Sequence, residues 1–129
     1  MVKWTPIAEP PRGHGAPVPN LIDYDAARAG FSWHAARGAL DGLPAGGINI
    51  AHEAVDRHAV GAAGGKVALR CLQRNGAVRH VTYGELAELT SRFAQALDHL
   101  GVGVGDRVFV LLPRVLELYV AALGTLKHR

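Results

Sequence analysis

The pattern of apolar and polar positions predicts a strand, a capped helix, a second strand and a second helix within residues 78–126. Thr82 and Glu85 have the spacing of a capping box, in which two residues hydrogen-bond each other's backbone N–H and start a helix. Apolar residues then recur every three or four positions, as on one face of a helix: Leu86, Leu89, Phe93, Leu97 and Leu100. Gly101 predicts the end of this helix, because glycine adopts the left-handed conformation at little cost.

A continuous apolar run at residues 107–112 follows this helix, after a turn at residues 103–106. Unbroken apolarity is typical of a strand that is buried on both faces of a parallel sheet. Pro113 ends the predicted strand, and residues 114–127 have the pattern of a second amphipathic helix. This order predicts an α/β fold with right-handed crossovers, of which the chain encodes only the first part.

The first 60 residues predict an extended arm followed by short helices. Five of the seven prolines lie in residues 1–20, and proline fixes its own backbone, so we expect a poorly ordered arm there. Each of three short helices expected after the arm follows a residue whose side chain can cap a helix. The caps and their helices are Asp23 with residues 26–29, Ser32 with residues 33–40 and Asn49 with residues 50–58.

A β-hairpin is predicted around Asn75 and Gly76, since Asn-Gly between two β-prone segments is a strong hairpin signal. The two segments are residues 67–72 and residues 78–81. The patterns together divide the chain into three parts: a Pro-rich arm at residues 1–20, a helical extension at residues 21–60, and the start of an α/β domain at residues 66–129.

Composition and charge exclude several classes of function. Hydrophobic residues make up 49% of the 129 residues, which is sufficient for a globular core. The net charge of +3 comes from scattered Lys and Arg residues, so we expect no nucleic-acid partner. We find no secretory signal and no apolar run near the roughly 18 residues that span a bilayer, so we expect no membrane partner. The single cysteine, Cys71, fits a reducing compartment, and we expect a cytoplasmic protein.

Three stretches resemble the motifs of chemical sites, but each departs from its motif. His52, Glu53 and Asp56 approach the helical zinc motif, yet Asp56 stands where the second histidine belongs. Residues 61–66 lack the first glycine and the final Ser or Thr of a phosphate-binding loop. Residues 101–105 resemble a dinucleotide-binding fingerprint, but they follow a predicted helix, whereas that fingerprint follows a strand. Other nucleophiles have no activating motif around them: Ser32, Cys71 and Ser91. We therefore expect no catalytic, cofactor-binding or metal-binding residue in this chain.

Residues 47–58, with the sequence GINIAHEAVDRH, resemble the start of AMP-forming acetate–CoA ligases, the acetyl-CoA synthetases, and of their short-chain acyl relatives. Further similar segments follow in the order found in that family: residues 31–33 upstream, and residues 82–86, 100–108 and 112–126 downstream. The resemblance covers roughly residues 23–129, and its specificity lies in the combination. The segment Gly-Asp-Arg-Val is shared with the wider adenylate-forming superfamily, whereas Val-Asp-Arg-His favours the acetyl and propionyl branch.

This resemblance implies a two-step reaction. A carboxylate attacks ATP at the α-phosphate, giving an acyl-adenylate and pyrophosphate, and the thiol of coenzyme A then displaces AMP. ATP, Mg²⁺ and coenzyme A are implied for the full-length family member, but the family's phosphate-gripping loop, ribose-binding Asp and catalytic Lys would lie beyond Arg129. The resemblance therefore implies scaffold alone: an incomplete N-terminal part of the large AMP-binding domain, preceded by a short helical extension and inactive by itself.

Two other interpretations stay open. The chain can be one half of a split ligase, with the remainder as a separate chain rather than in cis. It can also be a non-catalytic binding or regulatory protein that reuses the scaffold. A cooperative thermal transition of the isolated chain would indicate an independent module, whereas a molten or aggregated state would indicate part of a larger domain.

Overall fold

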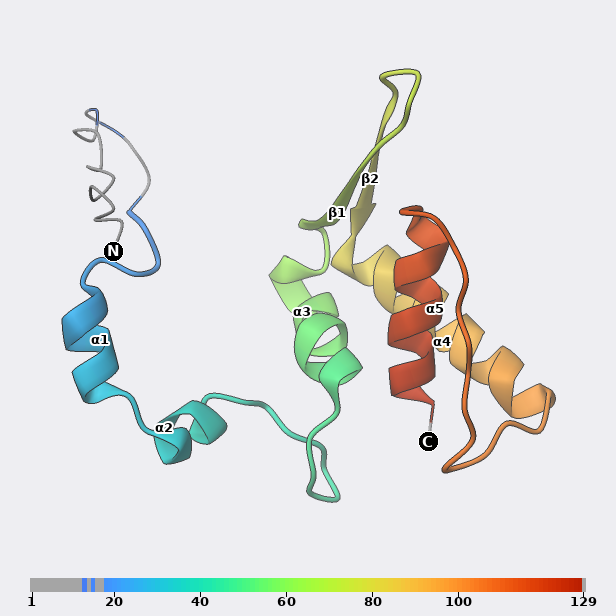
Figure 1. Ribbon diagram of the computed structural model, residues 1–129, viewed down its shortest axis with the longest axis horizontal. Coiled ribbons are helices and arrows are strands. Elements are labelled where there is room, and N and C mark those ends of the chain that lie inside the picture. The colour runs from blue at the N-terminus through green and yellow to red at the C-terminus, as the bar shows by residue number, and fades with distance from the viewer. Residues whose placement is uncertain (1–12, 14, 16–17, 129) are drawn as a thin grey trace, which may run out of the picture. The chain divides into compact units, whose positions relative to one another are not determined.

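A computed structural model describes residue 13, residue 15 and residues 18–128, so most of the predicted arm lies outside the described residues. The chain divides into two compact units, Met1–Ala36 and Arg37–Arg129. The second, larger unit contains the predicted hairpin and the two long helices (Figure 1).

Two short helices, α1 (Tyr24–Gly30) and α2 (Trp33–Gly38), begin at the predicted caps. The side-chain oxygens of Asp23 and Ser32 each accept a hydrogen bond from the backbone N–H three residues further on, at 2.9 and 3.1 Å. Each cap satisfies one N–H group that the first turn of a helix leaves without a partner. Helix α2 is shorter than predicted and ends at Gly38, since glycine is a poor helix former.

The helix predicted at residues 50–58 is present, but its backbone is wound unevenly. A π-helical turn, η1 (His52–Asp56), passes directly into a short α-helical turn, α3 (Arg57–Ala59), and a 3₁₀ turn, η2 (Gly61–Ala63), follows. In a π-helical turn the backbone hydrogen bonds reach one residue further than in an α-helix, so the turn is wider. The apolar periodicity of the sequence did not predict this widening.

The predicted hairpin is confirmed. Strands β1 (Val67–Leu72) and β2 (Val78–Thr82) pair antiparallel and form a two-stranded sheet. At the turn, the Gln73 N–H donates to the carbonyl of Ala77 at 2.9 Å, and the Gly76 N–H donates to the carbonyl of Gln73 at 3.0 Å. Gly76 has a φ of +82°, the left-handed conformation that explains why glycine occupies this position.

Helix α4 (Tyr83–His99) begins with the predicted capping box. The Thr82 hydroxyl accepts from the Glu85 N–H at 3.2 Å, and the Glu85 carboxylate accepts from the Thr82 N–H at 2.7 Å. The backbone and hydroxyl hydrogen bonds from Thr82 lower the pKa of Glu85, because they stabilise the carboxylate form. The box starts α4 directly after β2 and so fixes the corner between strand and helix.

The end of α4 is also the one predicted. Gly101 has a φ of +76°, and its N–H donates to the carbonyl of Asp98 at 3.0 Å. The Val102 N–H donates to the carbonyl of Leu97 at 3.1 Å. These two hydrogen bonds form a Schellman motif, which satisfies carbonyls that the last turn of a helix leaves free.

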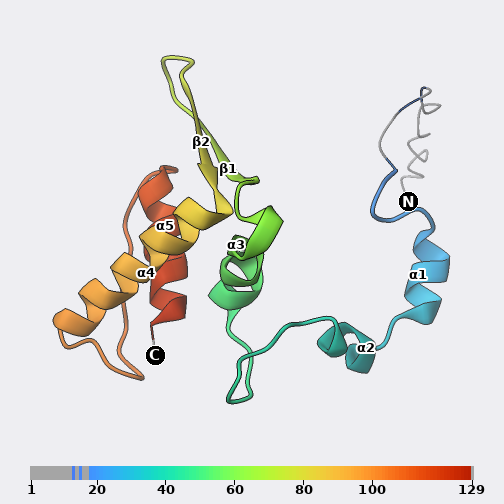
Figure 2. The same cartoon turned by 180° about the vertical axis from the view of Figure 1, so that it is seen from behind.

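Helix α5 (Leu116–Lys127) lies against α4, and it starts two residues later than the predicted segment (Figure 2). Gly124 marks the close approach of the two helices. A Cβ atom at this position would lie 2.9 Å from the Phe93 side chain and 2.9 Å from the carbonyl oxygen of Thr90. A close-packed interior has no room for that atom, so the contact requires glycine.

The core of the larger unit draws on one helical turn, one strand and the two long helices. Four buried apolar side chains meet there: Val55, Val81, Leu86 and Leu116. Partly buried residues surround them: Ala68, Leu69, Cys71, Ala87, Leu89, Val120 and Leu123. Because burial of apolar surface is the main driving force of folding, η1, β2, α4 and α5 depend on one another for stability.

Residues 107–112 form no strand, so the prediction of a buried strand there is wrong. The segment runs beside α5 (Figures 1 and 2). Phe109 is 89% exposed and Leu111 is 98% exposed. A strand exists only with a hydrogen-bonded neighbour, and within the described residues β1 and β2 pair only with each other. The sequence pattern correctly marked the segment as apolar, but a pattern in one segment does not reveal whether a neighbour is present.

The capping box is expected to stabilise the whole unit. Replacing the hydroxyl in Thr82→Ala removes the acceptor for the Glu85 N–H, and we expect the free energy of unfolding to fall by about 1 kcal/mol. Urea denaturation of the chain, followed by far-UV circular dichroism, measures this change. The control is Arg92→Gln, which breaks the exposed pair of Arg92 with Glu88 and should cost only about 0.3–0.5 kcal/mol. Equal losses of unfolding free energy in the two variants would contradict the stabilising role of the capping box.

Candidate functional site

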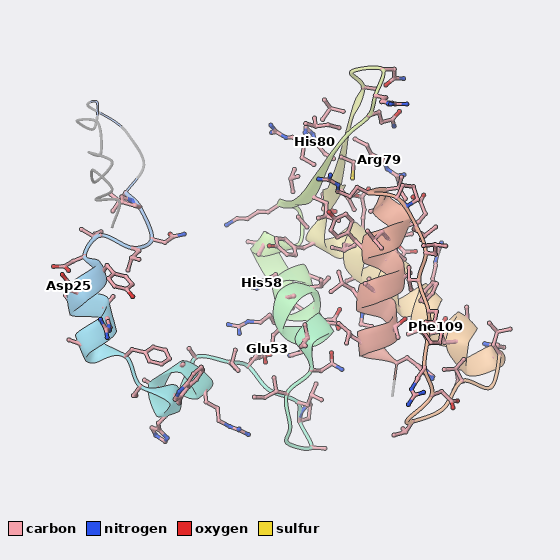
Figure 3. The ribbon with its side chains drawn as sticks, viewed as in Figure 1. Asp25, Glu53, His58, Arg79, His80 and Phe109 are labelled. Carbon is pink, nitrogen blue, oxygen red and sulfur yellow. The ribbon has the colours of Figure 1, made fainter. Side chains whose placement is uncertain are left out.

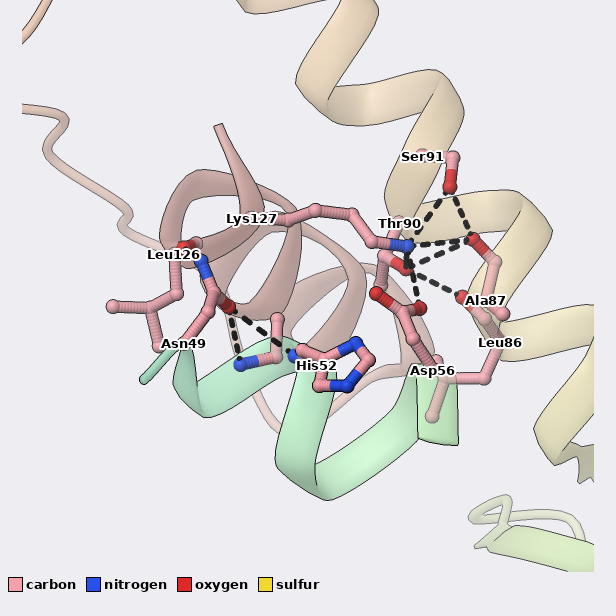
Figure 4. A network of polar contacts seen from close by, with 10 residues as sticks. Asn49, His52, Asp56, Leu86, Ala87, Thr90, Ser91, Leu126 and Lys127 are labelled. Carbon is pink, nitrogen blue, oxygen red and sulfur yellow. Dashed lines mark hydrogen bonds and ion pairs between the residues drawn. The ribbon is translucent and has the colours of Figure 1, made fainter. Parts of the chain in front are cut away.

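A cluster of polar side chains joins three segments of the larger unit, with Lys127 at its centre (Figure 4). The Lys127 Nζ atom lies 2.6 Å from Oδ1 of Asp56 and donates to Oγ of Ser91 at 2.8 Å. It also lies 3.3 Å from Oγ1 of Thr90 and 3.3 Å from the carbonyl oxygen of Ala87. The side chain of Lys127 is only 18% exposed, so η1, α4 and α5 share one shielded cation.

Asn49 makes a second link between the same helical turn and α5. Its side-chain oxygen accepts from the N–H groups of Ala51 and His52 at 2.9 and 3.2 Å, as the predicted cap requires. Its side-chain nitrogen donates to the carbonyl of Leu126 at 2.8 Å. One side chain therefore serves the start of one helical segment and the end of another, 77 positions apart in sequence.

The polar groups of this cluster satisfy one another. The hydroxyl of Thr90, a fully buried residue, donates within α4 to the carbonyl oxygens of Leu86 and Ala87, at 2.9 and 3.0 Å. Within the described part of the chain, no buried side-chain polar atom lacks a hydrogen-bond partner. A general base or a nucleophile must be able to reach a substrate atom, whereas these groups are directed at one another. We therefore assign the cluster a structural role.

Glu53 anchors the loop that precedes the helical turn. Its carboxylate accepts from the Gly42 N–H at 2.7 Å and from the Asp41 N–H at 3.1 Å, and it lies 2.6 Å from Nη1 of Arg57. These contacts, the hydrogen bond from Gly42 foremost, lower the pKa of Glu53 to about 2, although its partial burial acts in the opposite direction. The group is therefore ionised at neutral pH and cannot donate a proton.

The residues of the zinc-like stretch are directed at different partners. His52 Nε2 lies 2.7 Å from the carboxylate of Asp41, whereas Glu53 holds the loop and Asp56 holds the lysine of the cluster. His58 lies further along the same segment (Figure 3). Among residues 13, 15 and 18–128, no three His, Cys, Asp or Glu side chains converge as metal ligands do. This stretch therefore does not form a zinc site.

The glycine-rich stretch at residues 61–66 has a connecting role. The Gly64 carbonyl accepts from the Gly84 N–H at 2.9 Å, and the Lys66 carbonyl accepts from the Tyr83 N–H at 3.0 Å. The stretch leads into β1, so no helix N-terminus follows it to face a phosphate. Its hydrogen bonds attach it to the first residues of α4.

A polar groove of about 500 Å³ lies between the hairpin and the start of α5. Three cationic side chains line it: Arg74, Arg79 and Arg114. The carboxylate of Glu117 offsets part of their positive charge. Cys71 also lines the groove, but within the described residues its thiol has no hydrogen bond to a base that would activate it. No local sequence pattern predicts this grouping, because its members come from separate segments of the chain.

A second groove, of about 300 Å³, is mainly apolar and lies between α4, α5 and the end of the 107–112 segment. Its apolar lining consists of Leu89, Phe93, Leu112, Leu116, Val120 and Ala121. The sequence pattern placed Leu89 and Phe93 on the apolar face of the helix, and in the structure both side chains are only partly buried. Exposed apolar patches of this kind mark surfaces that another segment or molecule covers.

The sequence matches a known protein family. The AMP-binding enzyme family matches residues 55–129, which is more than half of the chain. Among curated proteins, the chain is 44% identical over 79 residues to the acetyl-coenzyme A synthetase of Streptomyces avermitilis, covering 61% of this chain and 12% of that protein. It is 36% identical over 109 residues to the acetyl-coenzyme A synthetase of Bacillus subtilis, covering 84% of this chain and 19% of that protein.

The fold also matches a solved structure. The crystal structure of Brucella canis acyl-CoA synthetase superposes with a TM-score of 0.72 and 34% sequence identity, covering 81% of this chain and 19% of that chain. The match confirms the predicted class, an incomplete α/β arrangement. The chain spans only 12% to 19% of the length of these three relatives.

The ion pair at the centre of the polar cluster is expected to contribute to stability. Lys127→Met leaves the carboxylate of Asp56 without its cation, and we expect the free energy of unfolding to fall by about 1–3 kcal/mol. Urea denaturation measures the loss. The matched control is Lys66→Met at an exposed position, with an expected change of about 0.5 kcal/mol or less. A loss for Lys127→Met no larger than the control's would show that the pair is energetically neutral.

The lowered pKa of Glu53 predicts a pH dependence of stability. A carboxyl whose pKa falls from 4.5 to about 2 on folding contributes stability that is complete above pH 4.5 and is lost as the pH falls toward 2. We therefore expect Glu53→Gln to be less stable than the unmodified chain at pH 7, and the difference to shrink between pH 4.5 and pH 2. Urea midpoints across this range test the prediction, with Glu88→Gln at an exposed position as control. A difference that does not vary with pH would refute it.

Proposed function

Because the chain belongs to the AMP-binding enzyme family, we propose that it forms the N-terminal part of an acetate–CoA ligase or of a short-chain acyl relative. The observation that carries the proposal is the similarity over 84% of the chain to a protein named acetyl-coenzyme A synthetase. The matching fold of an acyl-CoA synthetase, at 34% identity, supports the same assignment. Most of the segments that carry the resemblance, residues 47–58, 82–86, 100–108 and 112–126, lie in the larger unit, and residues 31–33 lie in the smaller one.

In the proposed reaction, a carboxylate oxygen attacks the α-phosphorus of ATP, and the bond to pyrophosphate breaks. The thiolate sulfur of coenzyme A then attacks the acyl carbon, forming a thioester and releasing AMP. The charged groups of this chain with the best-defined contacts, Glu53, Asp56 and Lys127, are paired internally. Mg²⁺ in an ATP-dependent enzyme is held by one or two carboxylates together with the phosphates, and the carboxylates of Glu53 and Asp56 are already paired with Arg57 and Lys127. We therefore propose that ATP, Mg²⁺ and coenzyme A are bound by residues outside these 129.

The role proposed for this chain is structural: it forms part of the scaffold of the AMP-binding domain. The core of the larger unit and the close contact of α5 with α4 form this scaffold, and the 107–112 segment runs beside α5. A family domain of this kind needs such a rigid support, because catalytic groups must be held within a fraction of an ångström of their working positions. Acyl specificity then belongs to the part of the ligase that this chain does not contain.

A split ligase, with the remainder supplied as a separate chain, is the second candidate. The exposed apolar residues Phe109 and Leu111 fit this candidate as well as the first, since either a separate chain or a covalently joined remainder could cover them. Both candidates assign the same reaction and the same role to this chain. They differ in whether the remainder is joined in cis.

We propose the cytoplasm as the compartment. Cys71 is a free thiol, which fits a reducing environment. None of the helices described by the structure is both long enough and apolar enough to cross a membrane. The proposed substrates, ATP and coenzyme A, are charged and water-soluble.

The isolated chain is expected to show no acetate-dependent exchange of pyrophosphate with ATP, because the residues proposed to bind ATP lie outside it. The Bacillus subtilis acetyl-coenzyme A synthetase, assayed in parallel, is the positive control. Measurable exchange by the isolated chain would overturn the assignment of scaffold alone.

A chimera tests the proposed function directly. The 109 matched residues of the Bacillus subtilis protein are replaced by the matching residues of this chain. We expect the chimera to fold and to form acyl-adenylate with acetate at a rate within about tenfold of the parent, because the substituted part supplies no catalytic group. Its folding is checked by thermal denaturation. A chimera that folds cooperatively and forms no adenylate would contradict the proposal.

A further inference from the structure

The turn of the hairpin contains an asparagine that is followed directly by a glycine, Asn75 and Gly76. Residues 72–80 are all exposed, and the turn lies at the end of the hairpin that points away from α4 and α5 (Figures 1 and 2). Besides forming the turn, this pair is chemically reactive, because the side-chain amide of an asparagine lies within reach of the backbone nitrogen of the next residue.

The side chain of Asn75 is folded back along the chain. Its Oδ1 atom accepts a hydrogen bond from the Ala77 N–H at 3.0 Å, so the side chain spans the peptide of Gly76. This arrangement is an Asx turn, in which an asparagine side chain imitates a backbone turn. It directs the amide carbon of Asn75, Cγ, toward the backbone nitrogen of Gly76, and the hydrogen bond polarises the carbonyl group of that carbon.

Glycine leaves the path to this nitrogen open. Gly76 has no side chain, and no atom lies within 4 Å of the place where a Cβ would stand. Its N–H donates to the carbonyl of Gln73 at 3.0 Å, and this hydrogen bond must open before the nitrogen can react. Because the residues of the turn are exposed and bury no apolar side chain, local opening requires little free energy.

We propose that Asn75 is a modification site, at which the side-chain amide is lost through a cyclic imide. The nitrogen of Gly76, after giving its proton to hydroxide, attacks Cγ of Asn75 and forms a new carbon–nitrogen bond. The bond from Cγ to the side-chain nitrogen breaks, and that nitrogen takes up a proton and leaves as ammonia. Water then opens the five-membered ring, so the only reactant consumed is water, and no group is oxidised or reduced.

The ring can open at either of its two carbonyl groups. Attack of water at Cγ restores the ordinary backbone and leaves an aspartate. Attack at the backbone carbonyl leaves an isoaspartate, in which the chain continues through Cγ and is longer by one backbone atom. The register of a hairpin is set by the length of its loop, so isoaspartate should disturb the hydrogen bond of 2.9 Å from the Gln73 N–H to the Ala77 carbonyl. Both products add a negative charge beside Arg74.

Asn49 is a matched control within the same chain. It precedes Ile50, whose branched Cβ obstructs the approach to the backbone nitrogen. Its side chain is also held by three hydrogen bonds, with Ala51, His52 and Leu126. We therefore expect Asn49 to keep its amide under conditions in which Asn75 loses it.

Asp41 is a second control, because it also precedes a glycine. The Gly42 N–H donates to the Glu53 carboxylate at 2.7 Å, and the Asp41 carboxylate lies 2.7 Å from Nε2 of His52. An ionised carboxylate is also a poorer electrophile than an amide. Cyclisation at Asp41 would change no mass, so a gain in mass distinguishes the reaction of Asn75 from it.

Incubation of the purified chain at physiological temperature, followed by mass spectrometry of its proteolytic peptides, tests the proposal. We expect the peptide containing Asn75 to gain about 1 Da, the difference between an amide and an acid. Its rate should exceed that of the Asn49 peptide by about tenfold or more and rise in proportion to hydroxide concentration. Asn75→Gln should slow the gain about tenfold or more, because the longer side chain does not direct its amide carbon at the same nitrogen. Methylation by an isoaspartyl methyltransferase identifies the isoaspartate product.

Hydrogen exchange measures the effect of the modification on the hairpin. The added charge allows the modified chain to be separated from the unmodified chain by ion exchange. We expect the amide of Gln73 to exchange about tenfold faster in the isoaspartate form, because its hydrogen-bond partner is displaced. The amide of Gly101, which belongs to the distant end of α4, should exchange at an unchanged rate.

Three results would overturn the proposal. The first is an equal rate at Asn75 and Asn49, and the second is a mass gain at Asn75 in the urea-unfolded chain but not in the folded chain. The third is an undiminished gain in Asn75→Gln, which would place the reaction elsewhere. The modification depends on the turn alone and not on the proposed function, so loss of the amide at Asn75 and the activity of the chimera are independent results.

Discussion

The packing of α5 on α4 is the contact on which the larger unit depends. Gly124 lets the two helices approach closely, and Leu116 and Leu86 bring both into one core. The same contact places Lys127 where it reaches Asp56 on η1, so the helical turn is held to both long helices by a shielded charge. Without α5, the carboxylate of Asp56 would lose its cation and the core would lose the buried side chain of Leu116.

That packing also explains why one side of the unit stays open. Helix α5 uses one face against α4 and the core, and the 107–112 segment lies beside it with Phe109 and Leu111 exposed. Within the described residues, β1 and β2 pair only with each other, so the hairpin supplies no neighbour to this segment. The unit therefore has a core of its own and an unfinished sheet, which is the state expected of a scaffold that functions inside a larger domain.

The polar residues with the best-defined contacts join segments of the larger unit. Glu53 holds a loop, Asn49 links two helical ends, and Lys127 links three elements. Each of these contacts satisfies a charge or a backbone group that would otherwise be costly to bury. The zinc-like spacing of His52 and Glu53 is thus the by-product of two structural hydrogen-bonding tasks on one helical segment.

Local interactions could be predicted from the sequence by itself. The caps at Asp23, Ser32 and Asn49, the box of Thr82 with Glu85, and the glycine stop at Gly101 all act between residues a few positions apart, so their spacing contains the information needed. The family resemblance also came from short segments in order. The sequence thus determined the positions of the main helices and of the hairpin, the α/β class and the family.

Only the tertiary structure decided which surfaces are covered. Two contacts join positions far apart in the sequence: Lys127 with Asp56, and Asn49 with Leu126. No local sequence pattern predicts either contact. The apolar run at residues 107–112 was predicted to be a buried strand, yet pairing and burial depend on a neighbour that the run does not itself encode. The hydrophobic pattern of a segment indicates which of its side chains can be buried. Whether they are buried depends on the segments that pack against it.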